Sequence, residues 1–229
     1  MTNCLVSVIV PCYNYGVYLN QLYDCLFEVK DCRLEIILID DHSTLPYSDE
    51  LLKLISDTET IFVSNLSRLG PSYSRNLGVS ISKGDFLLFI DADDLFDSSF
   101  VGKAIDRFTR LPLVGAISCF VQCFGFKDYI WFPSGGASQE FLNSNSCPMF
   151  SLVRREAWLD TDGFDEDFRI GYEDWDFWLQ LTKKNWLIYI IPEVLFFYRQ
   201  KSDSRVVETF KNHNVIFEQI KNKHTDLYL

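Results

Sequence analysis

Short apolar runs alternate with polar, loop-forming segments along the first 90 residues of the chain. The runs at 5–10, 34–39, 61–64 and 86–90 are predicted as strands, and helices are expected between them at 17–29, 48–56 and 71–82. Uninterrupted apolar runs are typical of strands that are buried on both faces of a parallel sheet. Strands that alternate with helices through short connections predict a doubly wound α/β sheet with right-handed crossovers.

This alternation ends near residue 112, and a mixed arrangement is expected after it. Strands are predicted at 114–121, 124–132 and 149–153, a loop at 133–138, a helix at 174–181, and two short strands at 187–191 and 194–198, on either side of Pro192. A last helix is expected at 206–221, where apolar residues recur at near-helical spacing. That helix would pack over the domain, or it would reach a partner or a membrane surface.

Polar side chains follow three of the four predicted parallel strands. Tyr13 and Asn14 follow the first strand, Asp41 follows the second, and Asp91 and Asp93 follow the fourth. Ligands of open α/β sheets bind at the carboxyl ends of the strands, so we expect a nucleotide crevice here. Neither a G-x-G-x-x-G loop nor a P-loop motif occurs, which disfavours a dinucleotide-binding dehydrogenase and a P-loop phosphotransferase.

The fourth apolar run stops at three carboxylates within four residues, Asp91, Asp93 and Asp94. Hard divalent cations such as Mg2+ or Mn2+ prefer carboxylate oxygens and often share them with substrate phosphates. The cluster therefore predicts a site for a divalent metal and a diphosphate. The simpler alternative is helix capping by Asp97 or Ser98, but capping needs one such residue and not three.

A second acidic cluster, Glu173, Asp174 and Asp176, lies at the start of the helix expected at 174–181, beside large aromatic residues. Carboxylates at a helix start are stabilised by the helix dipole, so capping alone would account for them. Aromatic faces also suit stacking on sugar rings, and a carboxylate among them can accept a proton from a hydroxyl. We expect Glu173 and Trp175 to contact an acceptor, while the capping alternative stays open.

Composition limits the class of protein. The chain has 229 residues, of which 48% are hydrophobic and 16% aromatic, which suits one large globular domain. The net charge of −11 disfavours a duplex nucleic-acid binder. Seven cysteines without zinc-finger spacing are expected as buried free thiols of a cytoplasmic protein. Neither a signal peptide nor a membrane span is indicated, although peripheral membrane association stays open.

Eight segments together resemble the inverting nucleotide-sugar glycosyltransferases of family two, which have the GT-A fold. In order, they are 7–14, 35–44, 65–70, 74–78, 84–94, 153–156, 163–166 and 172–176. Each segment is a weak motif alone, but their order is specific, and the resemblance covers about residues 5–204. It implies a Rossmann-like, mostly parallel central sheet flanked by helices, a small second mixed sheet and a C-terminal helix.

The resemblance also implies a division of the chain and roles for its residues. Residues 1–204 would form one catalytic domain, with a nucleotide-binding part at 1–112 and an acceptor part at 113–204, followed by a C-terminal helix and tail at 205–229. On the donor side, the expected nucleotide contacts are Pro11, Tyr13, Asn14, Asp41, Arg75, Asn76 and Asp91. Asp41 would bind the base, typically uracil, and Asp91 would reach the ribose.

In the same family pattern, Asp91 and Asp93 form a DXD motif, in which Asp93 coordinates Mn2+ or Mg2+ on the diphosphate of a UDP-sugar. Asp174 matches the general base that deprotonates an acceptor hydroxyl. One position departs from the pattern, because Lys201 stands where many relatives carry a metal-binding or phosphate-binding histidine. Lysine could pair with the diphosphate as a point charge, or it could face solvent. Of the histidines, His42 is expected in a loop, and His213 and His224 facing solvent.

The expected function is the metal-dependent transfer of a sugar, with inversion, from a nucleoside diphosphate sugar to a hydroxyl of a glycan or lipid-linked acceptor, as in polysaccharide biosynthesis. The C-terminal helix could add a homo-oligomer or peripheral membrane contact. An alternative is a catalytically weak or partner-dependent glycan-binding subunit, supported by Lys201 and the short chain. A nucleotidyltransferase is disfavoured because a glycine-rich loop does not follow the first strand.

Overall fold

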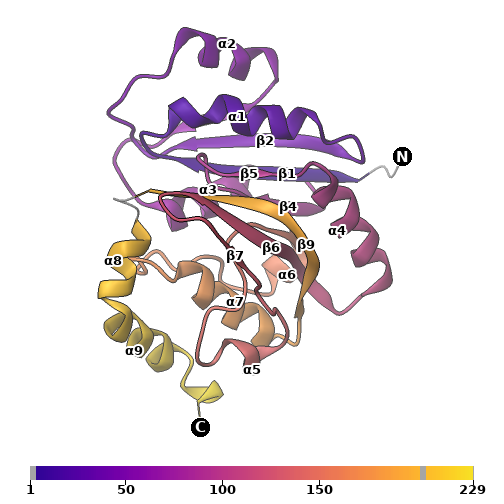
Figure 1. Ribbon diagram of the computed structural model, residues 1–229, viewed down its shortest axis with the longest axis vertical. Helices are drawn as coiled ribbons and strands as arrows, with labels where there is room; N and C mark the ends of the chain where they lie inside the picture. The colour runs from indigo at the N-terminus through magenta and orange to yellow at the C-terminus, as the bar shows by residue number, and fades with distance from the viewer. Residues whose placement is uncertain (1–3, 202–204, 229) are drawn as a thin grey trace.

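The computed structural model describes residues 4–201 and 205–228. A curved sheet runs through it in the order β3-β2-β1-β4-β8-β6-β9-β5 (Figure 1). The first four strands are parallel: β3 (Ile61–Ser64), β2 (Arg33–Asp40), β1 (Leu5–Cys12) and β4 (Phe86–Phe89). They alternate with α1 (Gly16–Phe27), α2 (Asp49–Asp57) and α3 (Pro71–Ile81), and α4 (Ser99–Arg110) follows. The predicted doubly wound α/β class is confirmed.

The remaining strands continue the same sheet. β8 (Ser151–Arg154) pairs antiparallel with β4, and β6 (Val114–Gly125) pairs antiparallel with β8 and parallel with β9 (Leu187–Gln200). Two short strands, β5 (Leu95–Phe96) and β7 (Tyr129–Trp131), pair with β9 and β6. The mixed part that the sequence predicts as a small second sheet is therefore joined to the parallel part through the β4–β8 pair.

Alternation of side chains along the strands divides the core between the two faces of the sheet. Val6, Val8 and Val10 point to one face, where they form a cluster with buried residues of α1, α2 and α4. Ile9 points to the other face, whose cluster includes Val79 of α3 and the buried apolar residues of α7 (Glu173–Lys183). Two small helices, α5 (Ser138–Phe141) and α6 (Arg155–Leu159), add to this second layer.

The strands predicted around Pro192 and at 124–132 differ from the structure. The strands expected on either side of Pro192 are one strand, β9, because its pairing with β6 shifts from Cys119–Ile191 to Phe120–Val194 and leaves Pro192 in a bulge. The segment expected as a strand at 124–132 is the end of β6, a turn and the three residues of β7.

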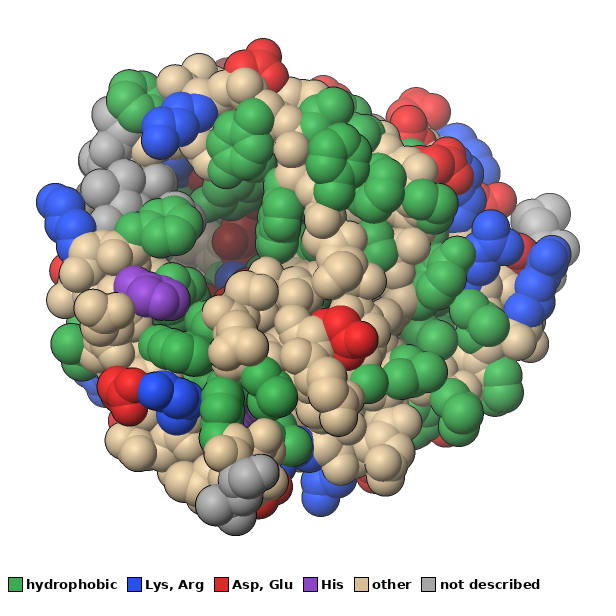
Figure 2. Space-filling view, turned by 60° about the horizontal axis from the view of Figure 1, so that its bottom comes forward, with side chains coloured by type: hydrophobic (Ala, Val, Ile, Leu, Met, Phe, Trp, Pro, Cys, Tyr) green, Lys and Arg blue, Asp and Glu red, His purple; other side chains and the backbone are tan. Residues whose placement is uncertain are grey.

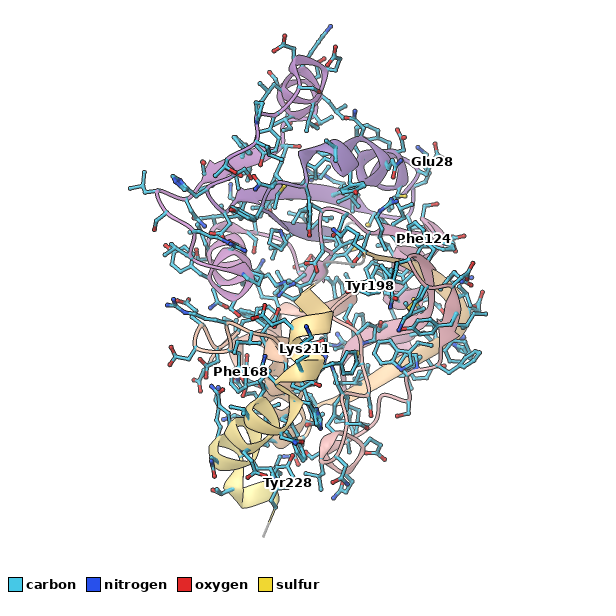
Figure 3. The ribbon with its side chains drawn as sticks, turned by 60° about the vertical axis from the view of Figure 1, so that its left-hand side comes forward. Glu28, Phe124, Phe168, Tyr198, Lys211 and Tyr228 are labelled. Atoms are coloured by element: carbon cyan, nitrogen blue, oxygen red, sulfur yellow. The ribbon has the colours of Figure 1, made fainter. Side chains whose placement is uncertain are left out.

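The C-terminal segment forms two helices, α8 (Arg205–Lys211) and α9 (His213–Lys223), and not the single helix expected. Figure 3 shows them in the lower half of the molecule, with labels at Lys211, where α8 ends, and at Tyr228, beyond α9. Ile216 and Ile220 of α9 are buried in the cluster that contains α7, so the expected packing over the domain is confirmed. Among the described helices, none is both long enough and apolar enough to cross a membrane.

Candidate active site

The carboxyl ends of β1, β2 and β4 meet at one edge of the sheet, next to the N-terminus of α7. Figure 2 shows a hollow on the molecular surface, ringed largely by hydrophobic side chains, with acidic and basic atoms at its floor. We name Asp91, Asp93 and Asp94 the donor-side cluster, and Glu173, Asp174 and Asp176 the acceptor-side cluster. Their surroundings decide what each carboxylate can do.

Asp41, at the end of β2, holds the loop that leads into α3. Its carboxylate accepts hydrogen bonds from Asn65 Nδ2 at 2.9 Å and from the backbone N–H groups of Leu69 and Gly70, each at 2.8 Å. Gly70 has a φ of 96°, which a side chain would strain. Asp41 is only 4% exposed, so the structure shows a loop anchor. Its contact with a nucleotide base stays a prediction.

The loop after β1 is built in a similar way. Asn14 has a φ of 61°, and its Oδ1 accepts hydrogen bonds from the backbone N–H groups of Thr44 at 2.8 Å and Leu45 at 3.1 Å. The guanidinium of Arg68, a residue that the sequence did not single out, lies 4.0 Å from the centroid of the Tyr13 ring. Pro11 is a buried residue of β1. Tyr13 and Asn14 are therefore half-buried in the loop that follows β1, whereas Pro11 is buried in the strand itself.

Each acid of the donor-side cluster has a defined partner. Arg75 Nη2 donates to Asp91 Oδ1 at 2.7 Å, and Lys201 Nζ donates to Asp93 Oδ2. Asp94, which is 2% exposed, accepts a hydrogen bond from the backbone N–H of Arg199 at 2.8 Å. Burial and the charges of the two neighbouring acids raise the pKa of Asp94 well above its ordinary value. Asp94 is thus the structural member of the cluster.

Lys201 does not face solvent. Its side chain is 18% exposed, and Nζ lies 3.3 Å from the centroid of the Tyr15 ring. Burial lowers the pKa of Lys201, but the hydrogen bonds and charges of Asp93 and Tyr15 outweigh burial and raise it. The lysine is therefore held in its charged form against the carboxylate that the family pattern assigns to a metal.

Arg75 joins the two acidic clusters. Its Nη1 donates to Glu173 Oε1 at 3.0 Å, while Nη2 binds Asp91. The arginine is 2% exposed, and the two carboxylates raise its already high pKa despite burial. Neighbouring Asn76 binds the backbone of Phe164 in both directions, at 2.8 and 3.0 Å. Arg75 therefore lies between the donor and acceptor sides, whereas the amide of Asn76 is used to hold a loop.

Among the described residues, Asp174 is the one acid of the acceptor-side cluster whose hydrogen-bond donors are all neutral. Asn145 Nδ2 donates to Oδ2, and the backbone N–H of Trp175 donates to Oδ1, both at 2.8 Å. Burial and the adjacent charge of Glu173 raise its pKa to about 6. Tyr172 precedes this turn in the left-handed conformation, with a φ of 62°. A partly exposed carboxylate with this pKa suits a general base near neutral pH.

Asp176 has the opposite environment. It is 0% exposed and accepts hydrogen bonds from His224 Nε2 at 2.7 Å, Lys223 Nζ at 2.9 Å and Gln180 Nε2 at 2.7 Å. His224 is 2% exposed, so the expectation that it faces solvent is wrong. His213 is half-buried, with Nδ1 at 2.9 Å from the hydroxyl of Tyr172. Asp176 therefore ties the C-terminal segment to α7.

Trp175 lies in the interior. It is 1% exposed, Nε1 donates to the carbonyl of Phe141 at 2.6 Å, and its ring stacks on Phe217 of α9 with centroids 5.2 Å apart. Glu173 is 6% exposed. The structure does not bring the Trp175 ring to the surface, so acceptor contacts by these two residues stay a prediction.

The carboxylates of the site can be compared with what a divalent metal requires. Within residues 4–201 and 205–228, no group of three His, Cys, Asp or Glu side chains is arranged to hold an ion alone. Mg2+ and related ions are often bound by one or two carboxylates together with substrate phosphates and water. Asp93 and Asp91 at one edge fit that second arrangement, with oxygens supplied by a diphosphate.

The fold and these two clusters define a GT-A-type α/β protein. Comparison with known families then identifies it: the model of Glycosyl transferase family 2 matches residues 7–170, and the chain belongs to this family. The predicted family is therefore confirmed.

Relatives and solved structures are similar over most of the chain. A Haemophilus influenzae protein described as an uncharacterized glycosyltransferase is 26% identical over 189 residues, which cover 79% of this chain and 63% of that protein. Staphylococcus aureus TarS residues 1–349 with UDP-GlcNAc has a TM-score of 0.70 at 18% identity, over 88% of this chain and 60% of that 1–349 chain. The Pyrobaculum calidifontis mannosyltransferase PcManGT with GDP-Man and Mn2+ has a TM-score of 0.68 at 18% identity, over 90% and 60%. The chain thus spans less than two thirds of these relatives.

Proposed function

We propose that the protein transfers a sugar, with inversion, from a nucleoside diphosphate sugar to a hydroxyl group of a glycan or lipid-linked acceptor. The observation that carries this proposal is the Arg75 bridge, because it places a donor-side acid, Asp91, beside the helix turn that bears Asp174. A donor at the strand ends and an acceptor hydroxyl at Asp174 would then meet at one site.

Asp174 is the proposed general base. Its raised pKa, about 6, leaves the carboxylate mostly ionised at neutral pH yet basic enough to take the proton of an attacking hydroxyl. Asn145 and the backbone N–H of Trp175 orient its two oxygens. Attack from the face opposite the leaving nucleoside diphosphate inverts the configuration at the anomeric carbon. Glu173 and Trp175 are proposed on the acceptor side through their place in the same turn.

The donor is proposed to lie over the ends of β1, β2 and β4. Tyr13, Asn14 and the Asp41-anchored loop would surround the nucleoside, Asp91 would reach the ribose, and Arg75 would orient Asp91. Asp93, with Asp91 nearby, would hold Mn2+ or Mg2+. A bound divalent ion supplies charge stabilisation to the departing diphosphate. Pro11 and Asn76 would act through the loops that they support.

Two similarities favour a nucleotide-sugar donor with a metal. TarS has been solved with UDP and with UDP-GlcNAc, and PcManGT with GDP-Man and Mn2+. We favour a UDP-sugar because the family resemblance implies uracil at Asp41, and because TarS has been solved with UDP and with UDP-GlcNAc. GDP is the alternative to test beside it. We further propose that residues 1–112 bind the nucleotide, that 113–204 bind the acceptor, and that the protein works in the cytoplasm in polysaccharide biosynthesis. The cytoplasm suits seven cysteines that form no disulfide among the described residues.

Ligand-induced stabilisation tests the proposed donor. A ligand at a hundredfold excess over its Kd stabilises the folded state by about 2.7 kcal/mol, so UDP with Mn2+ is expected to raise Tm by several degrees. Asp93→Asn should remove the part of this shift that depends on Mn2+. If UDP, GDP and TDP all leave Tm unchanged with Mn2+ present, the proposal is wrong.

The position of Lys201 on Asp93 favours a second candidate, a glycan-binding subunit that has lost strong catalysis. Slow hydrolysis of a donor sugar separates the two functions, since only an active site releases the nucleoside diphosphate. Hydrolysis that Asp93→Asn abolishes supports the transferase, and its absence with every nucleotide sugar supports the binding subunit.

A further inference from the structure

The Lys201 ammonium occupies the place where the proposed donor site requires a cation. Nζ donates to Oδ2 of Asp93, and the side chains of the pair are only 18% and 11% exposed. An ammonium pairs with phosphate oxygens as readily as with a carboxylate, since it is a compact point charge with three rotatable donors. The protein therefore carries its own cation next to the proposed diphosphate.

Several elements build this position. Lys201 directly follows β9. Arg199, two residues earlier, is fixed by its backbone hydrogen bond to Asp94. Tyr15 at the start of α1 lies under the ammonium at 3.3 Å, and Tyr18 lies 5.4 Å away. The negative faces of aromatic rings stabilise a cation. Such a built environment is not expected for a lysine that merely covers the surface.

A divalent ion and the Lys201 ammonium compete for the carboxylate of Asp93. Both are positive, so they repel each other at close range, and a protonated amine has no lone pair with which to join the coordination shell. An ion that binds Asp93 therefore weakens the pairing of this carboxylate with the ammonium. Lys201 remains attached to the end of β9, whichever cation Asp93 binds.

We propose that Lys201 is a diphosphate-binding residue that holds a nucleoside diphosphate when no divalent ion is present, and that it competes with a divalent ion for Asp93. This inference rests on the proposed nucleoside diphosphate donor and names the cation on which donor binding depends. A lysine in this place lets the site bind the nucleoside diphosphate after the metal is removed, but it weakens the affinity of the site for the metal.

Calorimetric titration of UDP, with GDP in parallel, tests the first half. The full chain is titrated in EDTA and again in Mn2+. For the nucleotide that binds, the two Kd values of the unaltered protein should agree within about tenfold, a difference of 1.4 kcal/mol. Lys201→Met should weaken binding in EDTA by more than about tenfold and change binding in Mn2+ much less. Lys83→Met, at an exposed position just before the amino end of β4, is the matched control and should change neither value.

Electron paramagnetic resonance of Mn2+ tests the second half without enzyme activity. Lys201→Met removes the competing cation, and Lys201→His supplies a neutral nitrogen ligand instead. Both variants should bind Mn2+ in the presence of the nucleoside diphosphate more tightly than the unaltered protein. Circular dichroism confirms that each variant is folded before it is compared.

The outcomes separate this inference from the proposed function. Binding in Mn2+ that vanishes in EDTA overturns the role of Lys201 and leaves the donor class intact. Unchanged EDTA binding by folded Lys201→Met, or unchanged Mn2+ affinity in both variants, overturns it as well. If neither nucleotide binds under either condition, the proposed donor is wrong and this inference is wrong with it.

Discussion

The donor-side and acceptor-side clusters each place three carboxylates within four residues, and within each cluster the three acids have different partners. In each cluster two acids bind a basic side chain: Arg75 and Lys201 on the donor side, and Arg75 again with Lys223 on the acceptor side. The third acids, Asp94 and Asp174, both have raised pKa values because of burial and neighbouring negative charge. Crowded charge alone therefore does not mark a reactive acid.

Access distinguishes those two acids. Asp94 is 2% exposed and is held by the backbone of Arg199, so a substrate cannot reach it. Asp174 is partly exposed and is held by an amide side chain from another loop. The difference teaches that a raised pKa indicates a general base only where the carboxylate is also open to a ligand.

Loss of the base should have the largest effect. Asp174→Asn keeps the shape and one of the two hydrogen-bond acceptors but cannot take a proton, so the rate of sugar transfer should fall about 10²- to 10⁴-fold. The Kd of the nucleoside diphosphate should hardly change, because Asp174 is proposed on the acceptor side. A steady-state assay of donor consumption, with exposed Asp167→Asn as the control, measures the effect. A variant that retains a tenth of the rate contradicts the assignment.

Removing Arg75 should weaken both clusters, because an acid of each cluster is paired with it. Arg75→Met leaves Asp91 and Glu173 without this partner, and loss of one member of a buried ion pair typically costs about 3–5 kcal/mol in the free energy of unfolding. Urea denaturation should show this loss. Arg110→Met removes an exposed pair with Asp106 and should cost less than about 1 kcal/mol. Equal losses in the two variants would show that Arg75 does not bind the clusters together.

The same substitution should have opposite effects at Asp174 and Asp176. The pKa of Asp174 is raised from 3.8 to about 6 in the folded protein, so folding favours its protonated form. Its stabilising contribution is present below pH 3.8 and is lost as pH rises through 6. At pH 7.5, Asp174→Asn should therefore stabilise the protein by about 1–3 kcal/mol, and this gain should vanish near pH 4.

Asp176→Asn should instead destabilise the protein by about 3 kcal/mol, because it leaves Lys223 and His224 without their buried carboxylate. Thermal unfolding of both variants at pH 7.5 and pH 4 provides the measurement. A stabilising effect at both positions would remove the distinction between a reactive acid and a structural acid.

The smallest predicted effect concerns the tuning of the base. Asn145 donates to the ionised form of Asp174, so Asn145→Ala should raise the Asp174 pKa further and move the acid limb of the pH–rate profile to higher pH. At pH 6 the rate should fall about two- to tenfold, as expected for one hydrogen bond, with little change at pH 8.5. Exposed Asn143→Ala in the same loop is the control. An unshifted limb would assign the titration to another group.

The sequence predicted the parallel half of the fold well because its signals are local. The run at 61–64 coincides with β3, and the acids after residue 90 lie at the end of β4, as expected. Strand ends in such a sheet share an edge whatever the rest of the chain does. The place of Asp91 and Asp93 therefore follows from β4 alone.

The partners of these acids could not be predicted, because they are distant in sequence. Lys201 meets Asp93 across 108 positions, and Arg75 meets Glu173 across 98. No local pattern encodes such pairs. His224 is different, since the spacing of Ile216, Ile220 and His224 at intervals of four places all three on one helix face. That spacing could have corrected the expectation that His224 faces solvent.

The Arg75 bridge has a consequence for how the chain can be divided. A fragment that ends near residue 112 would contain β1 to β4, yet it would lack Glu173 and the β8 strand that covers one edge of β4. Its buried guanidinium would have one carboxylate instead of two, and its sheet would gain an open edge. The nucleotide half is therefore not a module that can be exchanged freely. A chimera that replaces the acceptor half must bring an acid to position 173.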